Sequence, residues 1–181
     1  MRQCKHSDAV KRMNRPSRLA LAVSRPKDGP ANIITLGWFM RTSIKPPMFA
    51  ISVGSTRYSH EILSANRNFV LAIPSVNMAE QTMQCGLQSG RDVDKIKEFN
   101  IKTNRGKLTQ IPILAEAVAN FECKTITQVR SGDHTIFVGE VKYSWQNDDE
   151  DIEQLLSIPA MDDRFIELIR KGGFAFGYIK E

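Results

Sequence analysis

The chain consists of short apolar runs separated by turn-forming residues. The longest uninterrupted runs, LALAV at 19–23 and FVLAI at 69–73, are five residues long. Runs of this length, rich in β-branched and aromatic residues and bounded by Gly, Pro, Asn or Asp, are typical of strands. A transmembrane helix needs at least about 18 apolar residues, so the pattern excludes one. The pattern therefore predicts a mainly β chain.

Strand candidates account for much of the chain. They are the segments 19–24, 32–40, 48–55, 68–75, 113–129, 134–146 and 174–180. The turn Ser131-Gly132-Asp133 joins two long candidates and predicts a β-hairpin.

A few short helices are expected outside these strands. Ser59 is a suitable N-cap for the segment HEILSAN. Asp162 is a suitable N-cap for DRFIELIRK, whose apolar face ends at Gly172-Gly173. Segments 77–89 and 92–99 are weaker candidates. Together these elements predict a mainly β (α+β) fold, a β-barrel with short peripheral helices, as one domain over residues 19–181.

Positive charge is concentrated at the N-terminus. Residues 1–27 hold eight Lys or Arg against one acid, whereas the net charge of the whole chain is +5. Residues 1–18 contain no Phe, Trp or Tyr, which argues against a nucleic-acid surface with stacking aromatics. We expect residues 1–18 to form a basic, solvated arm that contributes little to the core. The competing hypothesis is an arm that crosses a dimer and closes the partner's binding cleft.

The cysteines and histidines show no metal-ligand spacing. Cys4, Cys85 and Cys123 are far apart, and no C-x-x-C motif is present. His6, His60 and His134 do not complete a ligand set with them. Reduced thiols in the cytoplasm are the simplest interpretation, with no metal site. The acidic run at 148–153 is expected to be an exposed loop.

Common nucleotide-binding and hydrolase motifs are absent from the sequence, including G-x-G-x-x-G, the Walker sequence, G-x-S-x-G and H-E-x-x-H. Two polar segments remain. Segment 55–59 contains Arg57 and Ser59 between a strand and a helix start, which suits a phosphate site or simply a capped turn. Segment 85–90, which includes Ser89 and Gly90, precedes Lys95 and suits close approach to a ligand or a flexible turn.

Two further places could contact a ligand. Asn32, Thr35 and Trp38 belong to one strand candidate, where Trp38 could wall a flat ring or lie in the core. His134 opens the second hairpin strand and is either functional or simply solvated.

Five segments together carry a family resemblance. They are DGPANIITLGW at 28–38, KPPMFAISVGSTRYSHEIL at 45–63, NFVLAIPS at 68–75, CGLQSGRDVDK at 85–95 and GDHTIFVGEV at 132–141. In order and spacing the chain resembles the flavin reductase-like proteins of the FMN-binding split-barrel fold, and among them the flavoredoxin type. The resemblance extends from Leu19 to Tyr178.

The resemblance implies a homodimer in which each split barrel holds FMN non-covalently. It places Asn32, Thr35 and Trp38 at the isoalloxazine ring, and His134 close to the ring as the residue nearest the chemistry. Ser59 and Lys95 match phosphate-binding positions. From the chemistry of their segments, Arg57, Ser89 and Gly90 are expected as further cofactor contacts. A C-terminal aromatic, Phe174, is expected near the flavin.

The expected function is that of an FMN-binding oxidoreductase that passes electrons from NADH, NADPH or a partner protein through the flavin. His134 would act by hydrogen bonding or by shaping the nicotinamide approach, without a covalent intermediate. One alternative is a flavoredoxin-like electron carrier without nicotinamide activity of its own. Another is a binding module whose basic arm engages nucleic acid or an acidic partner.

Overall fold

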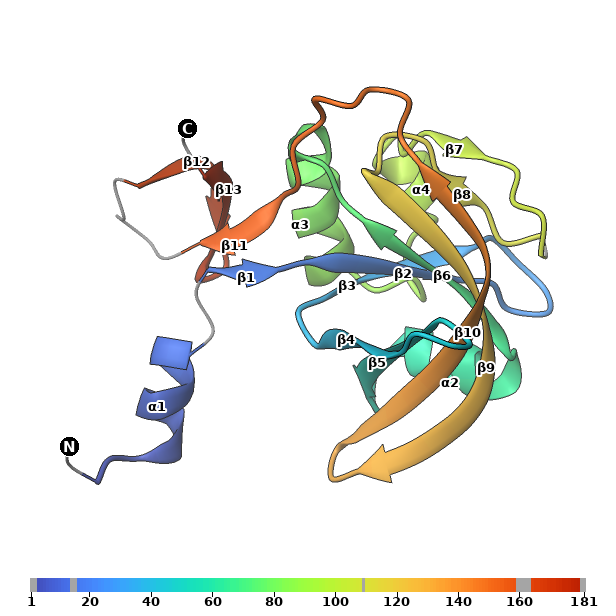
Figure 1. Cartoon of the computed structure of the whole chain (residues 1–181), viewed down its shortest axis with the longest axis horizontal. Coiled ribbons are helices and arrows are strands. Elements are labelled where there is room, and N and C mark those ends of the chain that lie inside the picture. The colour runs from blue at the N-terminus through green and yellow to red at the C-terminus, as the bar shows by residue number, and fades with distance from the viewer. Residues whose placement is uncertain (1–2, 14–15, 109, 159–163, 180–181) are drawn as a thin grey trace.

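Antiparallel strands make up most of the structure (Figure 1), a computed structural model that describes residues 3–13, 16–108, 110–158 and 164–179. The main sheet has seven strands. Their order is β3 (Asn32–Leu36), β2 (Ala20–Ser24), β6 (Asn68–Ile73), β9 (Ala119–Ser131), β10 (His134–Gln146), β5 (Met48–Gly54) and β4 (Phe39–Ser43). The mainly β class and the hairpin at Ser131-Gly132-Asp133 are confirmed.

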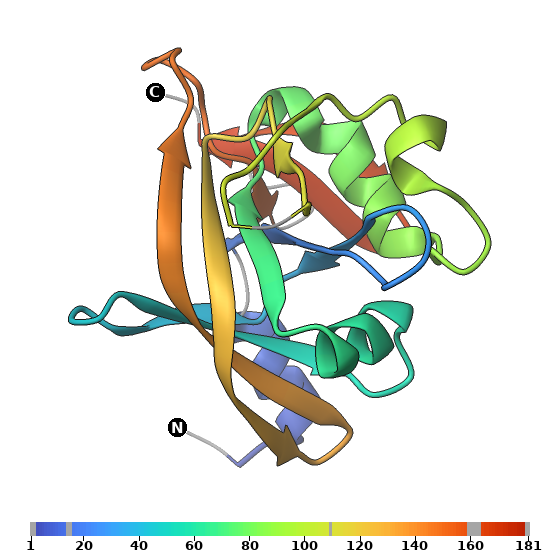
Figure 2. The same cartoon turned by 90° about the vertical axis from the view of Figure 1, so that its right-hand side faces the viewer.

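The sheet is coiled, and its two edges are joined by a very short connection. Strands β3 and β4 lie at opposite edges, yet only Gly37 and Trp38 separate them in the chain. Three peptide steps span about 11 Å at most, so the edges must approach one another. Figure 2 shows the long yellow and orange strands β9 and β10 bending to permit this. A coiled sheet with an open seam agrees with the split β-barrel, whereas the single strand expected over 32–40 is wrong.

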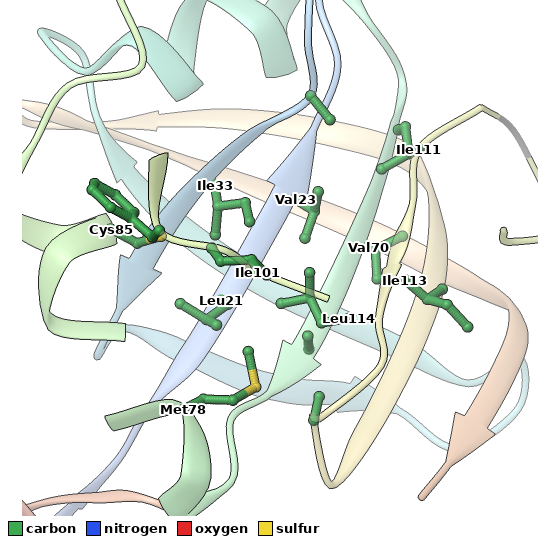
Figure 3. Close-up of a cluster of buried hydrophobic side chains, with 14 residues drawn as sticks. Leu21, Val23, Ile33, Val70, Met78, Cys85, Ile101, Ile111, Ile113 and Leu114 are labelled. Atoms are coloured by element: carbon green, nitrogen blue, oxygen red, sulfur yellow. The ribbon is translucent and has the colours of Figure 1, made fainter. Parts of the chain in front are cut away.

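Alternation along the central strands produces two hydrophobic cores, and every residue of β2 is buried. Ala20 and Ala22 face the inside of the coil with Phe69 of β6. Leu21 and Val23 point to the opposite face, where they join Val70, Met78, Cys85, Ile101, Ile111, Ile113 and Leu114 (Figure 3). A strand buried on both faces reads as a continuous apolar run, which explains LALAV.

Short elements cover the outer face of the sheet. They are η1 (Val76–Met78), α3 (Ala79–Leu87), α4 (Lys95–Glu98), β7 (Thr103–Asn104) and β8 (Ile113–Leu114), while α2 (Tyr58–Ala65) follows β5. The strand expected over 113–129 is wrong because β8 and β9 are separated. The Asn120 side chain accepts from Leu114 N at 2.8 Å and donates to Leu114 O at 3.0 Å, which fixes the turn between them.

A second sheet lies beside the first and joins the first strand of the chain to its last three. Its order is β1 (Ser17–Arg18), β11 (Leu156–Ile158), β13 (Phe174–Ile179) and β12 (Phe165–Lys171). The helix expected over DRFIELIRK is therefore wrong, and Asp162 lies outside the described residues. Gly172 and Gly173, with φ of 59° and 80°, close a two-residue hairpin turn instead of ending a helix.

The basic arm contains a helix, α1 (His6–Met13), which stands apart from the sheets in Figure 1. The last two arm residues form β1, where Ser17 pairs with Ser157. The acids between 148 and 153 are exposed, as expected. Among the described residues, no helix has the length and apolar character required to span a membrane.

Candidate functional site

A cavity of about 1010 Å³ opens at the seam of the coiled sheet. One wall is the end of β3 with the connection to β4, residues 34–38, and another is the end of β5, residues 52–54. The remaining lining residues are Val10, Ser17, Leu19, Arg57, Thr82, Met83, Gly86, Leu87, His134, Ser157, Phe174 and Phe176. The cavity therefore lies where the main sheet, α3, the second sheet and the arm meet.

Five of the residues expected at the site line this cavity: Thr35, Trp38, Arg57, His134 and Phe174. Trp38 and Phe174 are 58% and 50% exposed, so both form an open aromatic rim. The alternative that Trp38 is a core residue is wrong. The reason is the seam, which places Trp38 in the short connection between two sheet edges.

His134 forms part of the same wall as Trp38. Their ring centroids are 4.7 Å apart with an interplanar angle of 42°. His134 pairs with Gly54 across the β5–β10 ladder, and its side chain is only 25% exposed. Its Nδ1 lies 2.7 Å from Oδ1 of Asp133. That hydrogen bond, with the adjacent imidazole charge, holds the pKa of Asp133 below its ordinary value.

The loop from β5 into α2 places Arg57 and Ser59 differently. Arg57 is the N-cap residue of α2 by position, whereas Ser59 lies inside the helix and is 3% exposed. Its hydroxyl accepts a hydrogen bond from Nδ2 of Asn32 at 2.7 Å. The expected capping role of Ser59 is therefore wrong, because the helix begins at Tyr58 and the hydroxyl is bonded to a neighbouring strand.

Asn32, Ser59 and Gly90 form a second polar group that does not contribute to the lining of the cavity. A Cβ at Gly90 would lie 2.0 Å from Oδ1 of Asn32, so only glycine permits this approach. That Oδ1 atom is buried and has no hydrogen-bond partner. Ser89 lies in the same loop, where its hydroxyl accepts from Arg91 N at 3.2 Å. The structure thus brings together three of the residues expected at a ligand.

Lys95 opens α4 and is 3% exposed, and it does not line the cavity either. Its Nζ donates to Ile33 O at 2.7 Å and to Cys85 O at 2.8 Å. Burial lowers the pKa of Lys95, the neighbouring Cys85 opposes this, and the charge of Arg57 lowers it further. The positive charges of Arg57 and Lys95 therefore repel one another, although Arg57 lies in the cavity wall and Lys95 in α4.

Helix α3 contributes Thr82, Met83, Gly86 and Leu87 to the lining, and none of these was expected from the sequence. Thr82 is fully buried, and its hydroxyl has no hydrogen-bond partner. Its carbonyl accepts from the Thr35 hydroxyl at 2.5 Å, which ties α3 to β3. The helical pattern of 77–89 predicted the element, but nothing in it indicated which side faces a cavity.

Metal ligation is not supported in the part of the chain that the structure describes. No group of three or more His, Cys, Asp or Glu side chains there could hold a metal ion. Cys4, Cys85 and Cys123 are free thiols. The site and its surroundings offer an aromatic rim, the buried hydroxyls of Ser59 and Thr82, the exposed cation Arg57 and the buried cation Lys95.

The chain is similar in fold or in sequence to several known proteins. A flavoredoxin from Methanosarcina acetivorans superposes with a TM-score of 0.77 and 24% identity, covering 100% of this chain and 92% of its own. An uncharacterised Archaeoglobus fulgidus protein is 29% identical over 117 residues, 65% of this chain and 66% of the relative. An NADH-dependent FAD reductase from Streptomyces globisporus is 29% identical over 115 residues, 60% of this chain and 59% of the relative.

The chain spans 66% and 59% of the length of these two sequence relatives, less than two thirds of each. The family model for the flavin reductase like domain matches residues 13–162, which include both walls of the seam and all of α3. On this match the chain belongs to the flavin reductase-like domain family.

Proposed function

We propose that this protein binds FMN in the seam cavity and passes electrons from a reduced nicotinamide or a partner protein through the bound flavin. The observation that carries the proposal is the pairing of an aromatic-rimmed cavity with two cations, the exposed Arg57 in its lining and the buried Lys95. Trp38 and His134 wall the cavity, Arg57 lines it, and the charge of Arg57 acts on Lys95. A cavity of about 1010 Å³ is large enough for a cofactor together with part of a second ligand.

The residues present fit the two halves of FMN. A flat ring system needs an apolar slot with a few polar contacts, which Trp38, Phe174 and the unpartnered Thr82 hydroxyl offer. A phosphate needs cations and close backbone amides, which Arg57, Lys95 and the loop at Ser89-Gly90 offer. Ser59 and the orphaned Oδ1 atom of Asn32 add polar capacity beside that loop.

The chain's own residues would bind and orient the reactants. Bound FMN supplies the hydride and electron-transfer chemistry. Trp38 and Phe174 would exclude water from one side of the ring. His134 would hydrogen-bond a reactant or shape the approach of a nicotinamide, with Asp133 fixing its ring. Neither nucleophilic nor covalent chemistry by a side chain is required.

The alternative is a flavoredoxin-like carrier that holds FMN but does not itself oxidise nicotinamide. The open aromatic rim favours neither function, because it suits a small ligand or a docking protein. The visible spectrum of the purified protein tests flavin binding, since oxidised flavin is yellow. Steady-state oxidation of NADH and NADPH with added FMN then separates the reductase from the carrier. A colourless protein that does not quench FMN fluorescence would contradict both.

The phosphate is tested by comparing FMN with riboflavin. Charge-assisted hydrogen bonds contribute roughly 1.5–3 kcal/mol, so Arg57→Ala should weaken FMN about tenfold or more. Riboflavin should be much less affected. Arg67→Ala, an exposed arginine outside the cavity lining, is the matched control. Lys95→Ala is expected to weaken FMN binding similarly. This substitution also leaves the carbonyls of Ile33 and Cys85 without their donor, so the stability of the variant must be measured in parallel.

The homodimer follows from the family resemblance and from the shape of the site. Trp38, Leu87 and Phe174 are exposed apolar residues at the cavity, and a second subunit could cover them. Light scattering at micromolar concentration should return about twice 20.4 kDa. A mass near that of one chain would contradict the dimer. Three free thiols support a reducing compartment such as the cytoplasm.

A further inference from the structure

We propose that Asp133 is a positioning residue that holds His134 with the proton on Nδ1, which leaves the Nε2 lone pair available to the cavity. The consequence for turnover rests on the function proposed above. The proposal rests on the 2.7 Å contact between His134 Nδ1 and Asp133 Oδ1 at the turn between β9 and β10.

The backbone holds both residues firmly. Ser55 N donates to Asp133 O at 2.9 Å, which fastens the turn to the end of β5. His134 pairs with Gly54, and a Cβ built at Gly54 would lie 3.5 Å from His134 Nε2. The centroid of the Trp38 ring lies 4.7 Å from that of the imidazole. With the backbone and Trp38 limiting the ring's position, the hydrogen bond at Nδ1 determines which nitrogen is free.

The chemistry of the pair then follows from its donors and acceptors. A carboxylate only accepts hydrogen bonds, so a neutral imidazole facing it must carry its proton on Nδ1. Nε2 is then an acceptor, suited to a substrate N–H such as the carboxamide of a nicotinamide. The other charged or titratable groups nearby are Arg57, beside Gly54, and His60, bonded through Nε2 to the Thr135 hydroxyl.

Asp133 contributes little to stability, which makes it a clean target for mutation. Its side chain is 90% exposed, and exposed ion pairs stabilise folded proteins only weakly. Asp133→Asn keeps the shape and introduces an amide N–H that can donate to Nδ1, which favours the tautomer protonated on Nε2. Asp28→Asn is the matched control, since Asp28 is an exposed acid in the turn between β2 and β3.

Long-range ¹H–¹⁵N spectra of the flavin-free, histidine-labelled protein at neutral pH report the tautomer directly. We expect the Nδ1–H form for His134 in the wild type and in Asp28→Asn, and a shift to the Nε2–H form in Asp133→Asn. The same tautomer in the wild type and Asp133→Asn, or the Nε2–H form in the wild type, would overturn the proposal.

Kinetics supply the second readout. With FMN bound, Asp133→Asn should lower kcat/KM for the nicotinamide about tenfold, the equivalent of one hydrogen bond. FMN affinity and reduction of the flavin by dithionite, which has no carboxamide, should not change. An unchanged kcat/KM would overturn the role of Asp133 in turnover. A wild type that oxidises no nicotinamide would refute the reductase function, while the spectra would still decide the positioning of His134.

Discussion

At the residue scale, the polar side chains of the cavity differ in whether they already have a partner. Thr35 donates to a carbonyl and His134 is bonded to Asp133. The Thr82 hydroxyl, by contrast, is buried without a partner. A buried hydroxyl left unpaired destabilises the protein by about 1–3 kcal/mol. Such a group is expected where a ligand supplies the missing partner.

Thr82→Val should therefore have two effects of opposite sign. Valine keeps the shape and removes the hydroxyl, so the flavin-free protein should gain about 1 kcal/mol in urea unfolding. FMN and riboflavin should both bind about tenfold more weakly, because the ring loses a hydrogen bond. Thr125→Val is the control, since Thr125 also has a buried, unpartnered hydroxyl but does not line the cavity. Equal flavin affinity in the two variants would mean that Thr82 does not touch the ring.

The three thiols should differ strongly in reactivity. Burial raises the pKa of Cys85 and of Cys123 to about 12, whereas Cys4 is exposed. Because the thiolate is the nucleophile, the native protein should react rapidly at one thiol at pH 8. Cys4→Ser should abolish that rapid phase, and full reactivity should require denaturant. Rapid labelling of two or three thiols would contradict the burial.

The raised pKa values of Cys85 and Cys123 also determine whether stability rises or falls with pH. The folded-state pKa of each buried thiol lies above its ordinary value of 9.0, so the unfolded chain loses these protons first. These two thiols contribute fully to the stability of the fold below pH 9, and this contribution is lost as the pH rises toward 12. The lowered pKa of Lys95 acts in the opposite direction, because charging that buried amine opposes folding.

At the scale of elements, one buried carboxylate fastens a loop to the main sheet. Glu122 of β9 is 1% exposed. Its Oε1 accepts from Lys107 N at 2.9 Å and from Trp145 Nε1 at 2.7 Å, and its Oε2 accepts from Leu108 N at 2.6 Å. A Cβ at Gly106 would lie 2.7 Å from this carboxylate, so the loop approaches as closely as glycine allows.

Glu122→Gln replaces one carboxylate oxygen with an NH₂ group. This group would face an N–H donor, so at least one hydrogen bond is lost. Hydrogen bonds to a charged group contribute about 1.5–3 kcal/mol, so the free energy of unfolding should fall by about 2 kcal/mol. Hydrogen exchange at Lys107 and Leu108 should accelerate, and flavin affinity should not change, because the loop is remote from the cavity lining. Glu150→Gln, in the exposed acidic loop, should change neither property. Unaltered exchange in Glu122→Gln would show that other contacts hold the loop.

At the scale of the whole molecule, the N-terminal arm packs least against the rest of the chain. Helix α1 contributes Val10 to the cavity lining, but no arm residue belongs to the hydrophobic clusters of the described chain. Deleting residues 2–16 keeps β1, so the second sheet should form. FMN affinity should stay within about threefold, because an exposed segment contributes less than roughly 0.7 kcal/mol. FMN fluorescence quenching and the solution mass of the truncated protein test this.

Loss of flavin or of the dimer on truncation would contradict the passive arm. It would show that α1 covers the cavity of its own subunit or of the partner. Val10→Asp in the full-length chain separates these effects from the loss of the arm's charge. A passive arm predicts unchanged flavin affinity in that variant as well.

The sequence by itself determined several of the strands and one hairpin turn. Segments 19–24, 48–55 and 68–75 became β2, β5 and β6, because burial on a pleated sheet imposes a pattern that each segment carries locally. The hairpin at 131–133 followed from its turn residues. Five of the ten expected site residues line the cavity, and the family resemblance rather than the local pattern placed Trp38, His134 and Phe174 there.

Only the tertiary structure decided the rest, because it depends on contacts between distant segments. Phe165, Ile166, Leu168 and Ile169 satisfy a helical period, yet they form β12 because β13 pairs with them across Gly172-Gly173. The Ser59 hydroxyl accepts from Asn32, 27 residues away, instead of capping the helix, and Lys95 donates to Ile33 O across 62 residues. The cavity exists because the sheet coils until β3 and β4 meet at Trp38. A local pattern records burial and turn preference, but pairing, register and the shape of a seam are properties of segments in contact.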